Sequence, residues 1–301
     1  MRSSRLEISG SLCAIATPFD AGGALDLPAF GRLIDHQLDG GTQGIVVAGS
    51  TGEAHMLDEH EYERLLSFAV ERIAHRVPVI AGTGEAATSK TIALTKRART
   101  LAADAALVVT PYYVRPTQDG LRRHFAEVAE RSDIPVVMYN VPSRTGCDMH
   151  PETVAALRDT AGIVGIKEAV GKPERIAAIA QLQRPGFVYL SGDDGSAADA
   201  MLAGAGGVVS VVNNLVPKAF RALCDAARGG DRAAAKQHAG RIAPLLDALD
   251  CAPNPIAVKA GLAELGLCGA TLRLPLVELP PGPERTRLRE TLLSLAGVTT
   301  P

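Results

Sequence analysis

A lysine ends a short apolar segment near the middle of the chain. Lys167 follows the run Gly162-Ile163-Val164-Gly165-Ile166, whose β-branched residues bounded by glycine are typical of a buried parallel strand. An ammonium among apolar side chains is costly unless it is paired or deprotonated, and a neutral amine can attack a carbonyl carbon. The alternative is that Lys167 is simply the first solvated residue after the strand.

Tyr139 ends the preceding predicted strand, so it is expected beside Lys167. Neighbouring parallel strands lie about 4.8 Å apart. Because side chains alternate between the two faces of a strand, Lys167 should share its face with Gly165 and Ile163, and Gly165 should leave room for a long side chain. A phenol beside an amine in a dry interior suits proton transfer during imine chemistry.

Two loops offer groups that could bind carboxylates. The loop Gly49–Gly52 carries the hydroxyls of Ser50 and Thr51 and several backbone N–H groups ahead of a predicted helix, a cradle for an anion. Arg144 lies in a loop stiffened by Pro142, and a guanidinium binds a carboxylate bidentately. The alternatives are an ordinary turn for the first loop and a surface salt bridge for Arg144.

The elements that must position these groups alternate along the chain. Eight segments are predicted as strands: 11–17, 44–48, 77–81, 106–110, 135–140, 162–170, 187–191 and 207–212. Helices are predicted at 27–39, 58–75, 88–103, 117–131, 151–158, 196–203, 216–228, 232–249 and 256–265. Alternation of this kind predicts parallel pairing, and eight units predict an α/β fold, the closed (β/α)₈ barrel (TIM barrel).

A doubly wound open sheet is the alternative fold, but the first strand is followed by Thr17-Pro18-Phe19-Asp20 and not by a glycine-rich nucleotide loop. We expect residues 1–225 to form the barrel with the active site, and residues 226–301 to form a C-terminal helical extension.

Catalytic groups of a barrel belong at the C-terminal ends of its strands. The residues predicted at these ends include three of the five tyrosines. They are Thr17, Ser50, Thr51, Thr83, Tyr112, Tyr113, Tyr139, Lys167, Gly192, Asp193 and Ser210. This clustering favours an active site on that rim over isolated core-edge tyrosines.

Composition excludes several classes of function. The formal charge of −2, from 31 basic and 33 acidic residues, gives no electrostatic footprint for nucleic acid or an anionic membrane. The absence of an apolar run of about 18 residues predicts no membrane span. Five widely spaced cysteines without a Cys-x-x-Cys pair indicate neither a disulfide framework nor a zinc site, and suggest the cytoplasm.

No metal or cofactor is expected. The histidines include no His-x-x-x-His pair with a nearby acid, since His55 and His60 are five residues apart. A lysine that carries pyridoxal phosphate is another possibility for Lys167. However, the loops after the seventh and eighth strands are acidic or neutral and do not favour a phosphate.

The motifs taken in order resemble one known family. The segments 49–53, 110–113, 139–142 and 165–168 resemble the pyruvate-dependent class I aldolases, which include N-acetylneuraminate lyases. The resemblance extends from Thr17 to Pro275. Segments 142–148, 190–194 and 253–259 are most similar to the branch that condenses pyruvate with L-aspartate 4-semialdehyde, giving 4-hydroxy-tetrahydrodipicolinate in the first committed step towards diaminopimelate and lysine. A related lyase acting on a sugar acid or hydroxy-oxoacid remains an alternative, as does a non-catalytic oxoacid sensor.

The resemblance implies a role for each site residue. Lys167 would form the Schiff base with pyruvate, while Tyr139, Ser50 and Tyr113 would relay protons. Substrate binding would involve four residues: Thr51 for the pyruvate carboxylate, Arg144 for the aldehyde substrate, Val209 through its carbonyl, and Gly192. The resemblance further implies a homotetramer of two tight dimers, with Tyr112 and Tyr113 reaching across the dimer interface.

Two features depart from the family pattern. Ser50 stands where threonine is usual, which keeps a hydroxyl but frees its rotation. Family members inhibited by L-lysine carry histidines, an asparagine and a glutamate at four positions that here read Glu59, Tyr62, Ala86 and Lys90. We therefore expect lysine feedback to be weak or absent.

Overall fold

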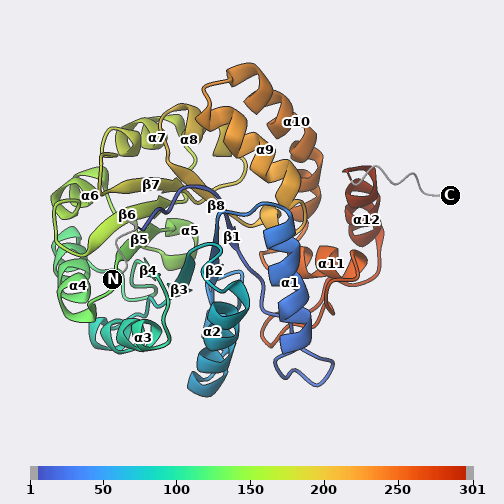
Figure 1. The fold of residues 1–301 in the computed structure, drawn as a ribbon, viewed down its shortest axis with the longest axis horizontal. Coiled ribbons are helices and arrows are strands. Elements are labelled where there is room, and N and C mark those ends of the chain that lie inside the picture. Colours follow the sequence, from blue (N-terminus) through green and yellow to red (C-terminus); the bar gives the residue numbers. More distant parts are fainter. Residues whose placement is uncertain (1–5, 296–301) are drawn as a thin grey trace.

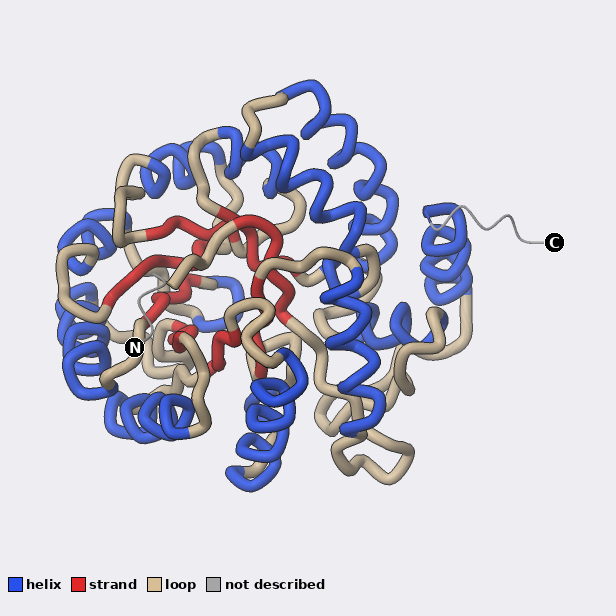
Figure 2. Tube along the Cα trace, viewed as in Figure 1, coloured by secondary structure: helices blue, strands red, loops and turns tan. Residues whose placement is uncertain are grey.

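Eight parallel strands close into a barrel at the centre of the structure, a computed structural model that describes residues 6–295. The strands are β1 Gly10–Ala14, β2 Gly44–Val47, β3 Val79–Gly82, β4 Ala105–Val109, β5 Val136–Asn140, β6 Ile163–Glu168, β7 Val188–Ser191 and β8 Gly207–Ser210. Each pairs with the next in sequence, and β8 pairs with β1. The ring of strands lies inside a ring of helices (Figures 1 and 2). The predicted (β/α)₈ barrel is confirmed.

Helices follow the strands and continue beyond the last one. Those around the barrel are α1 Leu27–Asp39, α2 Glu59–Ile73, α3 Thr88–Thr100, α4 Gln118–Ser132, α5 Pro142–Thr145, α6 Pro151–Leu157, α7 Pro173–Ala180 and α8 Ala197–Leu202. The later ones are α9 Pro217–Arg228, α10 Arg232–Leu249, α11 Ile256–Glu264 and α12 Pro283–Leu295, and two 3₁₀ turns are η1 Ala54–Met56 and η2 Val212–Asn214. The prediction lacks α5, α7 and α12, and the domain division at residue 225 stays a prediction.

Helix starts follow from capping chemistry in the sequence. Asp26 accepts a hydrogen bond from the Ala29 N–H at the start of α1, and Asp58 forms a reciprocal capping box with Glu61 at the start of α2. Each cap satisfies backbone donors that have no partner within the helix. Consequently α2 begins at Glu59, after the loop that carries Ser50 and Thr51 and the short turn η1.

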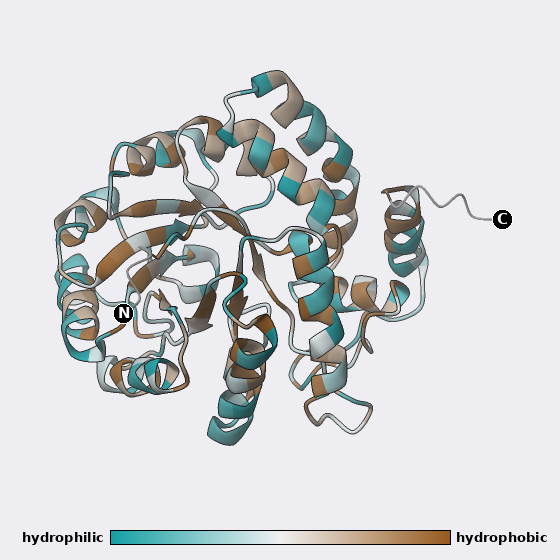
Figure 3. Ribbon diagram, in the orientation of Figure 1, coloured by the Kyte–Doolittle hydropathy of each residue, from teal (hydrophilic) through white to brown (hydrophobic). Residues whose placement is uncertain are grey.

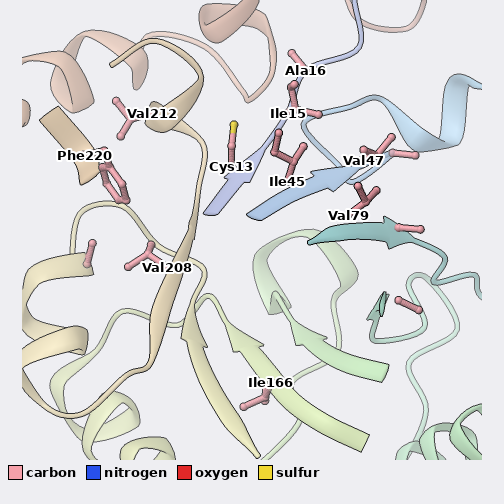
Figure 4. Packing of buried hydrophobic residues seen from close by; sticks show 14 of the residues in the cluster. Cys13, Ile15, Ala16, Ile45, Val47, Val79, Ile166, Val208, Val212 and Phe220 are labelled. Atoms are coloured by element: carbon pink, nitrogen blue, oxygen red, sulfur yellow. The ribbon is translucent and has the colours of Figure 1, made fainter. Parts of the chain in front are cut away.

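Two apolar layers hold the barrel together. Alternate strand side chains point inward, as Leu12, Val46 and Val137 do, or outward against the helices. Figure 4 shows part of the outer layer, with Cys13, Ile166 and Val208 on strands and Phe220 on α9. The helices turn hydrophilic residues outward (Figure 3). Burial on both sides explains why the strands are almost entirely apolar.

One expectation about the sixth strand is wrong. Ile163 packs in the outer layer and Val164 packs against the interior cluster, so Ile163 does not share a face with Lys167. The cause is an irregularity in the pairing of β5 with β6: Val136 pairs with Ile163, but Val137 pairs with Gly165. The extra residue reverses the alternation below Gly165.

The structure gives no sign of a membrane span or metal cluster in its described part. None of the helices within residues 6–295 has the length and apolar character needed to cross a bilayer. In the same residues, no three His, Cys, Asp or Glu side chains are grouped so as to hold a metal ion.

Candidate active site

Lys167 and Tyr139 meet at the C-terminal ends of β6 and β5. Their Cα atoms are register partners, and the Lys167 Nζ lies 4.2 Å from the centroid of the Tyr139 ring. Both residues are buried, with exposed fractions of 4% and 7%. The parallel register of the two strands thus places amine and phenol side by side in the barrel interior.

The described residues contain two buried lysines, and their surroundings differ. Lys259 of α11 forms a 2.7 Å ion pair with Glu53. Lys167 forms no ion pair within residues 6–295 and lines a cavity at the end of the barrel. Of these two lysines, Lys167 is therefore the one whose side chain faces a cavity that a substrate can enter.

Gly192 leaves the space that Lys167 occupies, and Gly165 lets β7 approach β6 closely. A Cβ on Gly192 would stand 2.8 Å from Lys167 Cε, and a Cβ on Gly165 would stand 2.5 Å from the backbone oxygen of Val188. The Gly192 N–H donates to the Glu168 carbonyl at 2.7 Å. Strand β7 can therefore approach the lysine closely only because residue 192 has no side chain.

A cavity of about 280 Å³ joins several of the predicted site residues. Its lining brings together the side chains of Lys167, Tyr139, Ser50 and Arg144. Lys167 and Tyr139 come from the ends of β6 and β5, and Ser50 comes from the loop after β2. Arg144 lies in the short helix α5 and not in the loop that was predicted. The cavity therefore holds an amine, a phenol, a hydroxyl and a guanidinium, the set needed to bind and activate a carboxylate-bearing carbonyl compound.

Thr51 lies next to this cavity and is tied to the C-terminal extension. Thr51 is 1% exposed, and its Oγ1 accepts a hydrogen bond from Asn254 Nδ2 at 3.0 Å. Arg144 Nη2 donates to the Asn254 backbone oxygen at 3.1 Å. Asn254 therefore links the two residues that were predicted to bind the two substrate carboxylates.

Besides Thr51 and Gly192, two more predicted residues lie outside the cavity lining. Val209 of β8 is buried in the interior cluster that also contains Tyr139. Tyr113 has a left-handed backbone with φ of 71° and is 92% exposed. Within one chain, Tyr113 is not brought to Lys167, and its predicted role in proton relay stays a prediction.

Tyr112, by contrast, lines the cavity. Its hydroxyl donates to Glu85 Oε2 at 2.8 Å, and its ring contacts the His55 ring edge-on at 4.7 Å between centroids. Burial, and then the hydrogen bond to Glu85, raise the pKa of Tyr112 to about 12. Tyr112 therefore remains a protonated phenol at neutral pH.

A polar network outside the barrel wall fixes the ends of β5 and β6. The buried Glu168 carboxylate accepts hydrogen bonds from Asn140 Nδ2, the Val170 N–H and Arg175. Arg175 also pairs with Asp148. Burial raises the pKa of Glu168 to about 7, while donors on both of its oxygens favour the carboxylate. The network anchors the segment that carries Arg144 to the strand that carries Lys167.

Sequence reasoning missed Asn254, the Glu168 network and the Lys259–Glu53 pair. The two buried acids gave little signal, because Glu168 ends a strand and Glu53 lies in a loop, where solvated residues are expected. Lys259 could have been found, since it is the only charged residue in the apolar run Ile256–Leu262. A lysine in such a run requires a partner.

A buried lysine beside a tyrosine, at the C-terminal rim of an eight-stranded barrel, is the arrangement expected of an aldolase that works through a lysine Schiff base. The chain belongs to the dihydrodipicolinate synthetase family, which matches residues 7–293.

Named relatives cover nearly the whole chain. It is 56% identical over 274 residues to the 4-hydroxy-tetrahydrodipicolinate synthase of Xanthomonas axonopodis pv. citri, covering 91% of this chain and 90% of the relative. It is 45% identical over 287 residues to that of Pseudomonas aeruginosa, covering 94% and 98%. Among solved structures, the chloride-inhibited dihydrodipicolinate synthase of Acinetobacter baumannii complexed with pyruvate superimposes with a TM-score of 0.93 at 40% identity, covering 97% and 100%.

Proposed function

We propose that this chain condenses pyruvate with L-aspartate 4-semialdehyde through a Schiff base on Lys167, giving 4-hydroxy-tetrahydrodipicolinate, in the first committed step towards diaminopimelate and lysine. The observation that carries the proposal is the buried Lys167 amine, which has no ionic partner in residues 6–295 and stands over Tyr139 in a cavity shared with Arg144. The names of the relatives support the choice of substrates.

The first half of the reaction uses pyruvate. The Lys167 amine adds to C2 of pyruvate, Tyr139 donates the proton with which the C2 oxygen leaves as water, and an imine remains. Loss of a proton from C3 then gives the enamine. Thr51 and the backbone N–H groups beside it hold the pyruvate carboxylate, while the Val209 carbonyl and Gly192 border the imine.

The second half uses the aldehyde. C3 of the enamine attacks the aldehyde carbon, whose oxygen takes a proton through Tyr139. The substrate's own amino group then adds to C2 and displaces Lys167, which closes the ring and restores the free amine. Arg144 holds the carboxylate of this second substrate, since a guanidinium matches a carboxylate bidentately.

The assembly proposed for the active protein is a homotetramer of two dimers. The large exposure of Tyr113 and the 56% exposure of the adjacent Val114 support burial of this segment by a second copy. Tyr113 of one copy would then complete the proton relay with Ser50 and Tyr139 of the other. We place the enzyme in the cytoplasm, where its five free cysteines would stay reduced.

Two measurements test the proposed function. Purified protein should consume pyruvate and aspartate semialdehyde together, and Lys167→Ala should abolish this turnover, while Lys172→Ala, at an exposed lysine, should not. Borohydride with pyruvate should add the mass of one reduced pyruvate to the peptide that contains Lys167. Release of pyruvate from a sialic acid in place of condensation would move the assignment to the lyase branch, and no pyruvate adduct would exclude both enzymes.

A further inference from the structure

The Lys259–Glu53 pair lies outside the catalytic cavity yet adjoins the residues proposed to bind pyruvate. Lys259 Nζ is 2.7 Å from Glu53 Oε1, and both side chains are completely buried. Neither residue lines the cavity that contains Lys167. A buried pair of this kind is weak evidence for stability, because desolvation offsets the attraction, so its placement calls for another explanation.

Glu53 ends the loop that carries Ser50 and Thr51. Its backbone is left-handed, with φ of 52°, and its N–H donates to the Ser50 carbonyl at 3.2 Å. A left-handed backbone is unfavourable for a residue with a Cβ and persists when surrounding contacts impose it. The contacts of its carboxylate therefore bear directly on the conformation of the preceding residues.

Both carboxylate oxygens of Glu53 are held by the C-terminal part of the chain. Oε1 binds Lys259 of α11, and Oε2 accepts the Arg273 backbone N–H at 3.2 Å. The Arg273 side chain pairs with Glu61 of α2. The loop between β2 and α2 is thus fastened by two segments more than 200 residues away.

Phe19, in the loop after β1, contacts both Lys259 and Arg273. Its buried ring lies 4.4 Å from Lys259 Nζ and 4.1 Å from Arg273 Cζ, measured to the ring centroid. Two residues earlier, Thr17 Oγ1 donates to the Gly52 carbonyl at 2.7 Å. Cation–π contact favours charged groups in this position, so Phe19 helps to keep both cations next to Glu53.

We propose that Lys259 is a positioning residue for the oxoacid site. Through Glu53, it fixes the loop Gly49–Glu53 so that Ser50 and Thr51 face the carboxylate of the substrate bound at Lys167. The C-terminal extension is therefore part of the binding site and not only a support for the barrel. The proposal rests on the proposed function for the identity of the ligand, and on the contacts of Glu53 for the mechanism.

The kinetic test compares three variants of the full-length protein. Lys259→Met leaves Glu53 buried without its lysine partner, and should raise KM for pyruvate about tenfold or more while kcat changes less than about threefold. Glu53→Gln should raise the same KM, and it is the gentler variant because an unpaired lysine can lose its proton. Glu53→Gln/Lys259→Met removes both charges and should recover most of the loss.

Arg285→Met is the matched control. Arg285 pairs with Glu264 at 2.8 Å, also in the C-terminal extension but away from the loop, and this variant should leave KM for pyruvate unchanged. A fall in melting temperature without a change in KM in both single variants would show a merely structural pair and overturn the proposal. A fall in kcat with unchanged KM would do the same.

Hydrogen exchange separates this proposal from the proposed function. In the absence of ligand, the backbone amides of residues 50–56 should exchange faster in Glu53→Gln and in Lys259→Met than in the wild type. In the double variant they should exchange more slowly than in either single variant. Unchanged exchange would overturn the positioning role even if the wild type condenses pyruvate. Faster exchange would support it even if borohydride trapped no pyruvate adduct on Lys167.

Discussion

Lys167 Nζ lies 4.2 Å from the centroid of the Tyr139 ring, and the two residues are register partners on β6 and β5. Hydrogen-bonded parallel strands cannot slip against each other without losing their ladder, so the distance between amine and phenol is set by the barrel itself. Both groups are also shielded from water. This geometry supports the proposed role of Tyr139 as proton donor and acceptor for chemistry at the Lys167 nitrogen.

Replacing Tyr139 by phenylalanine should therefore damage the chemical step more than binding. We expect kcat for condensation to fall about 10²- to 10⁴-fold, the usual contribution of a positioned acid–base group, with a smaller change in KM for pyruvate. Steady-state kinetics with both substrates gives the two values. Tyr189→Phe is the control, because Tyr189 is equally buried but packs in the outer layer against the helices. An unchanged kcat in Tyr139→Phe would contradict the assignment.

Gly192→Ala tests the close approach of β7 to the lysine. The new methyl would stand 2.8 Å from Lys167 Cε, so the amine must shift, and a misplacement of about 1 Å can cost about 10² in rate. Gly240→Ala in α10 is the control, since no atom lies within 4 Å of the added methyl there, and it should stabilise the helix by about 0.5–1 kcal/mol. If Gly192→Ala kept wild-type kcat/KM, the lysine would have more room than the structure gives it.

Arg144 should distinguish the two substrates. Arg144→Ala is expected to raise KM for aspartate semialdehyde about tenfold or more, with a much smaller effect on KM for pyruvate, since a bidentate contact to the second carboxylate is lost. Arg144→Lys should restore only part of the affinity, because an ammonium lacks the planar fork of donors. Arg123→Ala, an exposed arginine paired with Asp119 on α4, serves as the control. Equal rises in both KM values would argue against selective recognition of the aldehyde.

The parts of the fold that could be predicted are those fixed by local pattern. Apolar runs bounded by glycine and proline predicted the eight strands. Helices α1 and α10 begin at their predicted residues, where Asp26 and Asp231 cap the first turn. Ile163 could not be placed, because its face depends on an irregularity in the pairing with β5. Helix α7 has only eight residues, which gives too few turns for a clear period.

The site residues also divide into those that local pattern predicts and those that depend on contacts between distant parts of the chain. Lys167 and Tyr139 could be predicted because strand ends on one rim converge in a barrel. Asn254 could not be placed, since its contact with Thr51 joins residues 203 positions apart. Tyr113 could be singled out as a residue type, but one chain leaves it exposed, and the proposed relay through Tyr113 would require a second copy.

Acid sensitivity should depend on His124 of α4. Its Nδ1 lies 3.0 Å from Thr88 Oγ1, its Nε2 is buried without a hydrogen-bond partner in the described residues, and burial lowers its pKa to about 4. The pKa of His124 in the folded state is below the unfolded value of about 6.5. The neutral side chain therefore contributes to the free energy of unfolding above pH 6.5, and this contribution is lost as pH falls towards 4. It amounts to about 3 kcal/mol at most.

Melting temperatures measured at pH 7.5 and pH 5 test the contribution of His124 to stability. Wild-type protein should lose more thermal stability on acidification than His124→Leu, which keeps the packing against Phe125 but has no group to protonate. His238→Leu, at a half-buried histidine on α10, controls for the loss of a histidine. Identical pH dependence in wild type and His124→Leu would show that His124 does not contribute.

Feedback inhibition by L-lysine should be weak or absent. Lys90 lines a cavity of about 660 Å³ together with Glu59 and Tyr62, and like charges at close range disfavour binding of a second ammonium group. Tyr62 is 5% exposed and donates to the Gly82 carbonyl at 3.2 Å, so its side chain is fixed in the wall of this cavity. A dose–response curve of condensation activity should show no half-inhibition at sub-millimolar lysine. Lys90→Glu reverses the charge and should increase sensitivity if repulsion is the cause, whereas sub-millimolar inhibition of the wild type would refute the expectation.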